Sequence, residues 1–208
     1  FVEVSARAKR GDVQAQTELG DRLFEGDGVE QNLEQALVWY GKAAEKGSYD
    51  ALERLGDAYF YGYGASRDYG KAADNYEKAM AFNDYAKFKL GVCFLEGKGR
   101  PADPPKACLL FEEAAKKGIL SAQYRLGCCL LDGLGVEKNV ELAKKWLVRA
   151  ASLGYSDAMV CLGRAYEKGQ FGKVNLEKAR KWYRRATDGE IPREDALKLL
   201  QQLEEFDE

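Results

Sequence analysis

Histidine is absent from the 208 residues of the chain. Its absence excludes Ser-His-Asp and Cys-His catalytic sites, histidine-ligated zinc, and the side chain best suited to proton transfer near neutral pH. The five cysteines are Cys93, Cys108, Cys128, Cys129 and Cys161. An odd number without regular spacing does not indicate a disulfide framework, and adjacent cysteines are not a C-x-x-C motif. We therefore expect no catalytic residue, no metal and no cofactor.

The chain also lacks a surplus of either charge and any long apolar run. Its 32 basic and 34 acidic residues give a net charge of −2, whereas nucleic-acid and anionic-membrane binders normally carry a basic surplus. The longest apolar runs hold about five residues, such as Ala36 to Tyr40, far short of the ~20 that a membrane helix needs. These features argue against nucleic-acid binding and direct membrane insertion.

A segment of about ten residues recurs five times in altered form. It reads LGDRLFEGDG from Leu19, LGDAYFYGYG from Leu55, LGVCFLEGKG from Leu90, LGCCLLDGLG from Leu126 and LGRAYEKGQFG from Leu162. The successive spacings are 36, 35, 36 and 36 residues. A fixed period of this size indicates a stack of similar structural units, and such stacks typically bind partners.

This segment predicts the first helix of each unit, which spans about Val13 to Glu25 in the first copy. The glycine of the Leu-Gly pair lies inside the helix, where it costs roughly 0.5–1 kcal/mol relative to alanine. Its recurrence predicts close helix contacts without room for a side chain, for example at Gly56, Gly91 and Gly127. The Gly-x-Gly pair that follows is typical of a left-handed turn, and one inserted residue predicts a longer turn in the fifth copy.

A second pattern at a fixed offset predicts the other helix of each unit. Its apolar residues recur at spacings of three, four and seven, which indicates an amphipathic helix. The residues that open it are Asn32, Asp68, Asp103, Asn139 and Asn175. Asn and Asp suit an N-cap because the side-chain oxygen accepts a hydrogen bond from an orphan backbone N–H. Trp39, Trp146 and Trp182 belong to this helix and are predicted to lie in the core.

These helices assign residues 1–208 to a single repeat domain. The five repeats cover about residues 11–46, 47–81, 82–117, 118–153 and 154–189. Residues 1–10 resemble the end of a second helix, and the missing initiator Met favours an excised fragment or a processed product. The segment from Ile191 predicts a C-terminal helix within residues 190–208, whose acidic end from Glu204 to Glu208 suits a polar outer cap.

The combined motif resembles the Sel-1-like repeat family. It reads A-x-x-x-L-G-x-x-Y/F-x-x-G-x-G, an acidic or amide cap, and K-A-x-x-W/Y-Y/F-x-K-A-A-x-x-G, over about Gly11 to Gly189. Tetratricopeptide repeats are related, but their period is ~34 residues and their W-x-x-L-G start is absent here. The resemblance implies an all-α fold, a right-handed superhelical α/α solenoid of about five helix-pair repeats with a C-terminal capping helix. It also implies an adaptor role in protein complexes.

Cys93 and Cys108 fall near the end of the first helix and the start of the second helix of one unit. Antiparallel packing would place them at similar height, so they form either a disulfide or two buried thiols that act as small apolar groups. We favour the buried thiols. Free cysteines would favour a reducing compartment such as the cytoplasm.

By resemblance to the tetratricopeptide arrangement, the first helix of each unit lines a concave groove. The expected partner-binding residues are Asp57, Tyr85, Phe88, Val92, Tyr124, Cys128 and Arg164. The apolar members would form a floor, with Asp57 facing a basic part of the ligand and Arg164 an acidic part. Two interpretations stay open: Phe88 and Tyr124 pack against neighbouring helices, or they belong to an exposed patch that receives a peptide or helix.

The sequence favours a non-catalytic scaffold or adaptor that binds a protein or peptide partner in this groove. One alternative is a hydrolase-type enzyme, because a few cysteine-rich members of the family are linked to β-lactam chemistry. The absence of histidine and of an S-x-x-K signature argues against that alternative. Another is a structural segment that spaces other domains of a longer protein. The oligomeric state is open.

Overall fold

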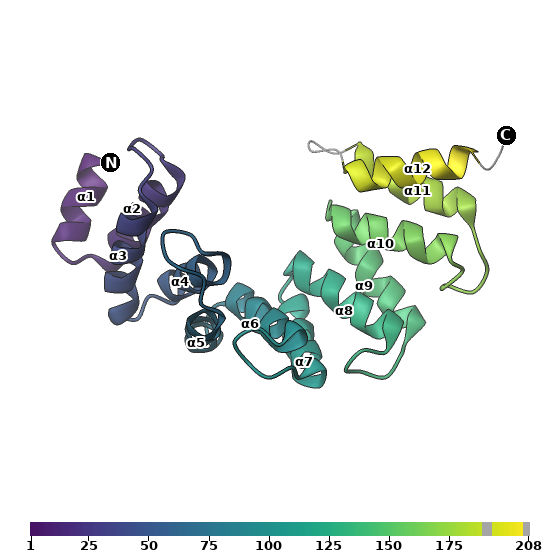
Figure 1. The fold of residues 1–208 in the computed structure, drawn as a ribbon, viewed down its shortest axis with the longest axis horizontal. Helices are drawn as coiled ribbons and strands as arrows, with labels where there is room; N and C mark the ends of the chain where they lie inside the picture. The colour runs from purple at the N-terminus through teal and green to yellow at the C-terminus, as the bar shows by residue number, and fades with distance from the viewer. Residues whose placement is uncertain (189–192, 206–208) are drawn as a thin grey trace. The chain divides into compact units, whose positions relative to one another are not determined.

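The computed structural model describes residues 1–188 and 193–205, and these residues form twelve α-helices and no strand (Figure 1). The helices are α1 (Val2–Lys9), α2 (Val13–Glu25), α3 (Leu33–Glu45), α4 (Tyr49–Tyr61), α5 (Tyr69–Ala79), α6 (Asp84–Glu96), α7 (Pro104–Lys116), α8 (Leu120–Asp132), α9 (Val140–Ser152), α10 (Ser156–Glu167), α11 (Leu176–Thr187) and α12 (Glu194–Glu205). The predicted all-α solenoid of helix pairs is confirmed, and α2 has the predicted bounds. None of the described helices combines the length and apolar character that a membrane crossing requires.

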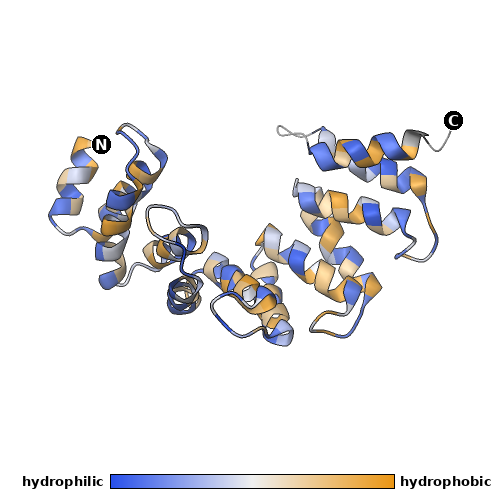
Figure 2. Ribbon diagram, viewed as in Figure 1, coloured by the Kyte–Doolittle hydropathy of each residue, from blue (hydrophilic) through white to orange (hydrophobic). Residues whose placement is uncertain are grey.

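The helices gather into two compact units, residues 1–103 and residues 104–208. In the first unit, α2 packs on α3 and α4 packs on α5; in the second, α8 packs on α9 and α10 on α11. Hydrophobic and hydrophilic residues alternate around the helices (Figure 2), as amphipathic helices require. Within each unit, every helix packs against the helices next to it in sequence, so the core of a unit is continuous along the chain.

In four of the five pairs the second helix starts at an Asn or Asp cap, as predicted. Asn32, Asp68, Asn139 and Asn175 each accept a 2.9 Å hydrogen bond from the backbone N–H three residues on. Helix α7 begins at Pro104, directly after Asp103. Proline is tolerated there because the N–H groups of a first helical turn have no intrahelical partner.

In four of the helix pairs, the glycine inside the first helix lies against the second helix. A Cβ atom added at Gly56 would be 2.6 Å from Cδ1 of Tyr76, and one added at Gly127 would be 2.6 Å from Cγ of Leu147. Both distances are too short for a real contact, so the predicted close approach is confirmed at these two positions. Gly91, at the same position of the third repeat, is buried.

The prediction that the tryptophans form the core was wrong by one helical position. Trp39, Trp146 and Trp182 are only partly buried, each with a cationic side chain over its ring, and Lys42 lies 4.1 Å from the Trp39 ring centre. The buried side chains are the next residues along, Tyr40, Leu147 and Tyr183, together with Tyr76 and Phe111. A position four residues after the buried alanine faces the partner helix, whereas a position three residues after it turns partly toward solvent.

The turn between the two helices of a pair contains glycines in the left-handed region, as predicted, with φ from 67° to 81° in the first four pairs. The second glycine of three of these turns lies against the start of the preceding pair's second helix. A Cβ added at Gly64 would be 2.7 Å from the carbonyl carbon of Leu33, and Gly99 and Gly135 approach Tyr69 and Pro104 in the same way. The turn after α10 is one residue longer, as predicted, and a Cβ at its Gly172 would meet no described atom within 4 Å.

The two terminal helices cover the ends of the units to which they belong. Helix α1 packs on α2 with Val4 and Ala8 buried, and α12 packs on α11 with Ala196 and Leu203 buried. The predicted C-terminal helix is therefore present. The predicted polar outer face from Glu204 to Glu208 lies outside the residues whose side chains the structure describes.

Candidate partner-binding pocket

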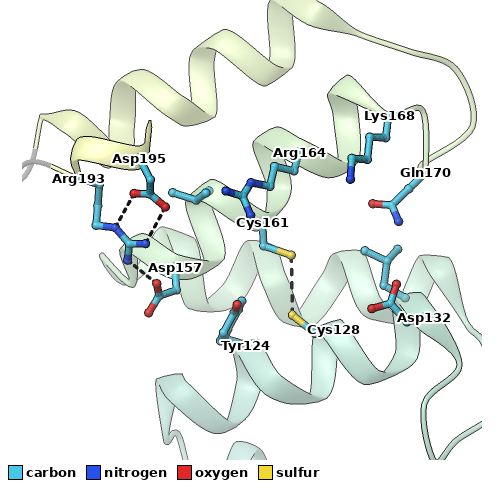
Figure 3. Close-up of a pocket in the computed structure, with 12 residues that line it drawn as sticks. Tyr124, Cys128, Asp132, Asp157, Cys161, Arg164, Lys168, Gln170, Arg193 and Asp195 are labelled. Carbon is cyan, nitrogen blue, oxygen red and sulfur yellow. Dashed lines mark hydrogen bonds and ion pairs between the residues drawn. The ribbon is translucent and has the colours of Figure 1, made fainter. Parts of the chain in front are cut away.

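A pocket of about 260 Å³ opens in the second unit, where α8, α10 and the start of α12 face one another (Figure 3). Its apolar part consists of Tyr124 and Leu131 on α8 and Val160 on α10. Its charged part consists of Asp132, Asp157, Arg164, Lys168, Arg193 and Asp195. The pocket thus combines an apolar surface with charges of both signs.

The helical period explains why these side chains share one surface. Tyr124 and Cys128 are four residues apart on α8, and Val160 and Arg164 are four residues apart on α10, so each pair projects from one helix face. The intervening Gly127 points to the other side, toward α9. One face of α8 and α10 therefore fills the core, and the adjacent face lines the pocket.

Arg193 ties the start of α12 to α10 across one end of the pocket. Its guanidinium donates two 2.9 Å hydrogen bonds to the Asp195 carboxylate and another to Asp157 (Figure 3). The hydrogen bonds from Arg193 hold the pKa of Asp195 below its usual range. Both carboxylates are thus already satisfied, and the charge of Arg193 is neutralised within the protein.

Arg164 and Lys168 differ from Arg193 because neither makes an ion pair or a hydrogen bond with a side chain in the described part of the chain. Both side chains are exposed, and they lie one helical turn apart at the edge of the pocket. Asp132 faces them from the end of α8 (Figure 3). Two cations without a carboxylate partner beside an apolar surface are suited to bind an acidic group.

Two thiols lie between the apolar and charged parts of the pocket. The Sγ atoms of Cys128 and Cys161 are 3.8 Å apart. The Tyr124 ring lies beside them on α8, with its centre 5.7 Å from that of Tyr155. Burial is the main reason that the pKa of Tyr124 is raised, so its hydroxyl stays protonated and can donate a hydrogen bond.

The structure brings three of the seven predicted groove residues together in this pocket, namely Tyr124, Cys128 and Arg164. The others, Asp57, Tyr85, Phe88 and Val92, belong to α4 and α6 of the first unit. The sequence did not indicate Asp132, Cys161, Lys168 or the Arg193 bridge. Lys168 follows the end of α10 and Arg193 directly precedes α12, where the repeat pattern gives no register. Cys161 lies one residue away from the expected inward position.

In the first unit, Asp57 is not a free acid at the edge of a groove, contrary to expectation. Its carboxylate accepts a 2.5 Å hydrogen bond from the Tyr76 hydroxyl and forms a 2.9 Å ion pair with Lys89. Lys89 is only 6% exposed and lies over the rings of Tyr61 and Tyr85. The charge of Asp57 is therefore used to satisfy a buried lysine.

Phe88 and Val92 do not form an exposed floor either. They are 7% and 8% exposed, and Phe88 contacts the ring of Tyr85, with ring centres 5.7 Å apart. Tyr85 is 39% exposed. Of the two interpretations, packing against neighbours describes Phe88, whereas Tyr124 remains partly exposed in its pocket.

Glu53 joins the charged cluster of the first unit as a buried carboxyl group. It is 4% exposed, and its Oε1 atom has no hydrogen-bond partner among the described residues. Burial and the neighbouring carboxylate of Asp57 raise the pKa of Glu53 to about 7, and Arg54 and Lys89 oppose that shift. This side chain can therefore change its charge near neutral pH.

All five cysteines are free thiols, and Cys93 and Cys108 are among the buried ones. The buried-thiol interpretation of these two residues therefore holds. Burial is the main reason that the pKa of each is raised.

A family model described as Sel1 repeat matches residues 13–48, 50–80, 84–119, 120–155 and 156–190. No curated protein matches the sequence. Among solved structures, a Sel1 repeat protein from Oxalobacter formigenes is 30% identical, with a TM-score of 0.82 over 91% of this chain and 76% of that one. A protective antigen of uropathogenic Escherichia coli strains that displays the SLR fold is 27% identical, with a TM-score of 0.78. It matches the whole of this chain, which spans about half (49%) of the antigen.

An immunity protein from Pseudomonas aeruginosa has the same fold at lower identity. It is 22% identical, with a TM-score of 0.59 over 93% of this chain and 78% of that one. At this level of identity the likeness concerns the fold alone.

Proposed function

The chain belongs to the Sel1 repeat family, and from that premise we propose that it is a non-catalytic scaffold that binds an acidic segment of a partner protein in the pocket between α8 and α10. Sel1 repeat folds are generally protein-interaction modules, and proteins of the family are typically non-catalytic. We propose that the partner binds in this pocket, that its binding segment is acidic, and that the chain catalyses no reaction.

The observation that carries the proposal is the unpaired state of Arg164 and Lys168. Arg193, on the same pocket, is bound by two carboxylates of the chain, whereas Arg164 and Lys168 bind none in the described residues. An aspartate, a glutamate or a terminal carboxylate of a partner could accept hydrogen bonds from the Arg164 guanidinium, whose planar fork suits a carboxylate. The negative charge of Asp132 would disfavour a ligand that carries several consecutive acidic residues.

The apolar part of the pocket supports a ligand with an apolar residue next to its acidic group. The partly exposed ring of Tyr124 is the main apolar contact that the pocket offers, because Leu131 and Val160, which also line it, are each only 4% exposed. Contacts with such a surface usually supply most of the binding free energy, while charges at the rim act mainly on association rate and salt dependence. The proposed recognition element is therefore a short segment that combines one acidic and one bulky apolar residue.

Selection from a random peptide library displayed on phage tests this proposal without a known partner. The folded chain is the bait, and peptides that also bind an Arg164→Glu variant are removed. We expect enrichment of peptides that contain an acidic residue beside an apolar one. For a synthetic enriched peptide, Arg164→Glu should weaken binding at least about tenfold, which corresponds to ~1.4 kcal/mol.

Lys181→Glu is the matched control, because Lys181 is an exposed cation on α11 of the same unit that does not line the pocket. The control makes the same charge change and should leave the affinity unchanged. Equal weakening by both variants would show a general charge effect instead of a site. Enriched peptides without acidic residues would contradict the proposed ligand class.

A further inference from the structure

Cys128 and Cys161 lie close together although they come from different repeats. Cys128 is on α8 and Cys161 is on α10, 33 residues later, and their Sγ atoms are 3.8 Å apart (Figure 3). Both line the pocket and both are partly exposed. A small reagent that enters the pocket can therefore reach either sulfur atom.

The other three cysteines are much less accessible. Cys93, Cys108 and Cys129 are 0%, 1% and 3% exposed. Cys108 and Cys129 are also close enough to share a hydrogen bond, but burial raises the pKa of both thiols, which keeps them protonated. The second unit thus contains two neighbouring thiol pairs, one open to the pocket and one enclosed.

The environment distinguishes the two thiols of the open pair. Hydrogen bonds from Cys161 and Tyr124, together with the charge of Arg125, lower the pKa of Cys128, and they outweigh the opposing effects of burial and of Asp132. The pKa of Cys161 is raised, first because of its hydrogen bond with Cys128 and then because of burial. Because the thiolate is the reactive form, Cys128 is the nucleophile of the pair and Cys161 is a neighbouring protonated thiol.

The distance between the sulfur atoms is compatible with bond formation. A disulfide needs an S–S distance of about 2.0 Å, so the two sulfurs must approach by about 1.8 Å from 3.8 Å. Rotation about the Cα–Cβ bonds moves each sulfur atom while the helices stay in place. Helices α8 and α10 already contact each other within the second unit.

We propose that Cys128 and Cys161 are an oxidation site at which a hydroperoxide forms a disulfide between α8 and α10. The Cys128 thiolate attacks one oxygen of the peroxide, the O–O bond breaks, and Cys128 becomes a sulfenic acid while the other oxygen leaves as hydroxide or alkoxide. The Cys161 sulfur then attacks the Cys128 sulfur, the S–O bond breaks, and water leaves with the proton of Cys161. The two thiols lose two electrons and two protons, and the peroxide is reduced to water or to an alcohol and water.

The bond would lie in the wall of the pocket between Tyr124 and Arg164. Its formation would move the two sulfur atoms from their present positions in that wall and change the space for a ligand. That consequence rests on the proposed function, whereas the oxidation itself does not. The test below measures the thiols alone, so its failure would leave the proposed function untouched.

The experiment treats the folded chain with hydrogen peroxide, blocks the remaining thiols with N-ethylmaleimide after unfolding, and maps the peptides by mass spectrometry. We expect a species that has lost two hydrogen masses and contains one disulfide, between Cys128 and Cys161. Cys93, Cys108 and Cys129 should all carry the blocking group. A dithiol reductant should restore five reactive thiols.

Two serine variants test the assigned order of reaction. In Cys161→Ser, the sulfenic acid on Cys128 should persist and react with dimedone, whereas in Cys128→Ser the thiol at Cys161 should stay reduced. Circular dichroism establishes that each variant is folded. The proposal is overturned if the unsubstituted chain keeps five free thiols under peroxide, or if its disulfide joins Cys108 to Cys129 or two separate chains.

Discussion

The ring of Tyr76 occupies the space that a side chain at Gly56 would need, and its hydroxyl donates a 2.5 Å hydrogen bond to Asp57, the residue after that glycine. Tyr40 has the same relationship to Gly20 and Asp21, with a hydrogen bond of 2.8 Å. A single tyrosine therefore makes both the apolar and the polar contact between the two helices of a repeat.

The glycine contact leads to a prediction with an internal control. Gly56→Ala should destabilise the fold by roughly 1–3 kcal/mol, because the added methyl group collides with the Tyr76 ring and overpacks the site. Gly41→Ala in α3 makes the same chemical change where a Cβ meets no described atom within 4 Å. That variant should gain roughly 0.5–1 kcal/mol from helix propensity. Urea unfolding followed by circular dichroism measures both, and a stabilised Gly56→Ala would refute the packing account.

The tyrosine hydroxyl leads to a second prediction. Tyr76→Phe keeps the ring but removes the hydrogen bond to Asp57, and it should cost about 1.5–3 kcal/mol because the acceptor is charged. Tyr59→Phe is the control, since Tyr59 lies on α4 of the same repeat and no hydrogen bond from its hydroxyl occurs in the described part of the chain. It should change the free energy of unfolding by less than about 0.5 kcal/mol. Equal effects of the two substitutions would show that the hydrogen bond between Tyr76 and Asp57 does not contribute to the free energy of unfolding.

The buried carboxyl group of Glu53 leads to a third prediction, on pH. Its pKa is about 7 in the folded chain, against an ordinary value of 4.5, so between these pH values the folded state binds more protons than the unfolded state. Stability must then fall as pH rises through this window. At about 1.4 kcal/mol per pKa unit, the loss between pH 4.5 and pH 8 is on the order of 3 kcal/mol.

Glu53→Gln removes this titration while keeping the shape of the side chain. The difference in unfolding free energy between the variant and the parent should therefore grow in favour of the variant from pH 5 to pH 8. Urea titrations at each pH measure it. Glu30→Gln, at an exposed position, should show no such trend. A difference that stays constant across the range would mean that Glu53 is ionised throughout.

Much of the fold could be predicted from the sequence because its determinants are local and repeated. An N-cap such as Asn139 lies three residues from the N–H it binds, and a Gly-x-Gly turn acts within its own loop. Such local patterns can be recognised in a single sequence, and five copies at a constant spacing make the prediction stronger. The bounds of α2 and the longer turn after α10 follow from these rules.

The tryptophan error has a different cause. Trp39 and Tyr40 are adjacent and both large, and the period of 3.6 residues alone does not decide which of them faces the partner helix. The glycine opposite decides it, because a flat ring at position 40 fits against Gly20 and its hydroxyl reaches Asp21. That relationship spans 19 residues and was not part of the local pattern.

The surroundings of the expected groove residues could be predicted least well from the sequence, because they depend on distant neighbours. Asp57 was expected to be free, but Lys89 and Tyr76 approach it from α6 and α5 and use its charge. Arg193 follows the last repeat, so the repeat pattern assigned it no position on a helix face. Tyr124 and Cys128 share a face because they are four residues apart on α8, and Arg164 joins them from the position of α10 that corresponds to Cys128 in the next repeat.

In three turns the second glycine contacts the start of the preceding repeat's second helix, and this contact limits how the chain can change in length. The contacts join Gly64 to Leu33, Gly99 to Tyr69 and Gly135 to Pro104. Each contact joins a turn to the start of the previous repeat's second helix, so the number of residues from one to the other must stay nearly constant. Inserting or deleting one residue in these three turns would shift the glycine and place a side chain against a backbone carbonyl. Removing one whole repeat would instead reproduce an equivalent contact, so we expect the fold to accept the loss of a repeat more readily than the loss of one residue from these turns. The one insertion that is present lies in the turn of Gly172, where no described atom approaches the glycine.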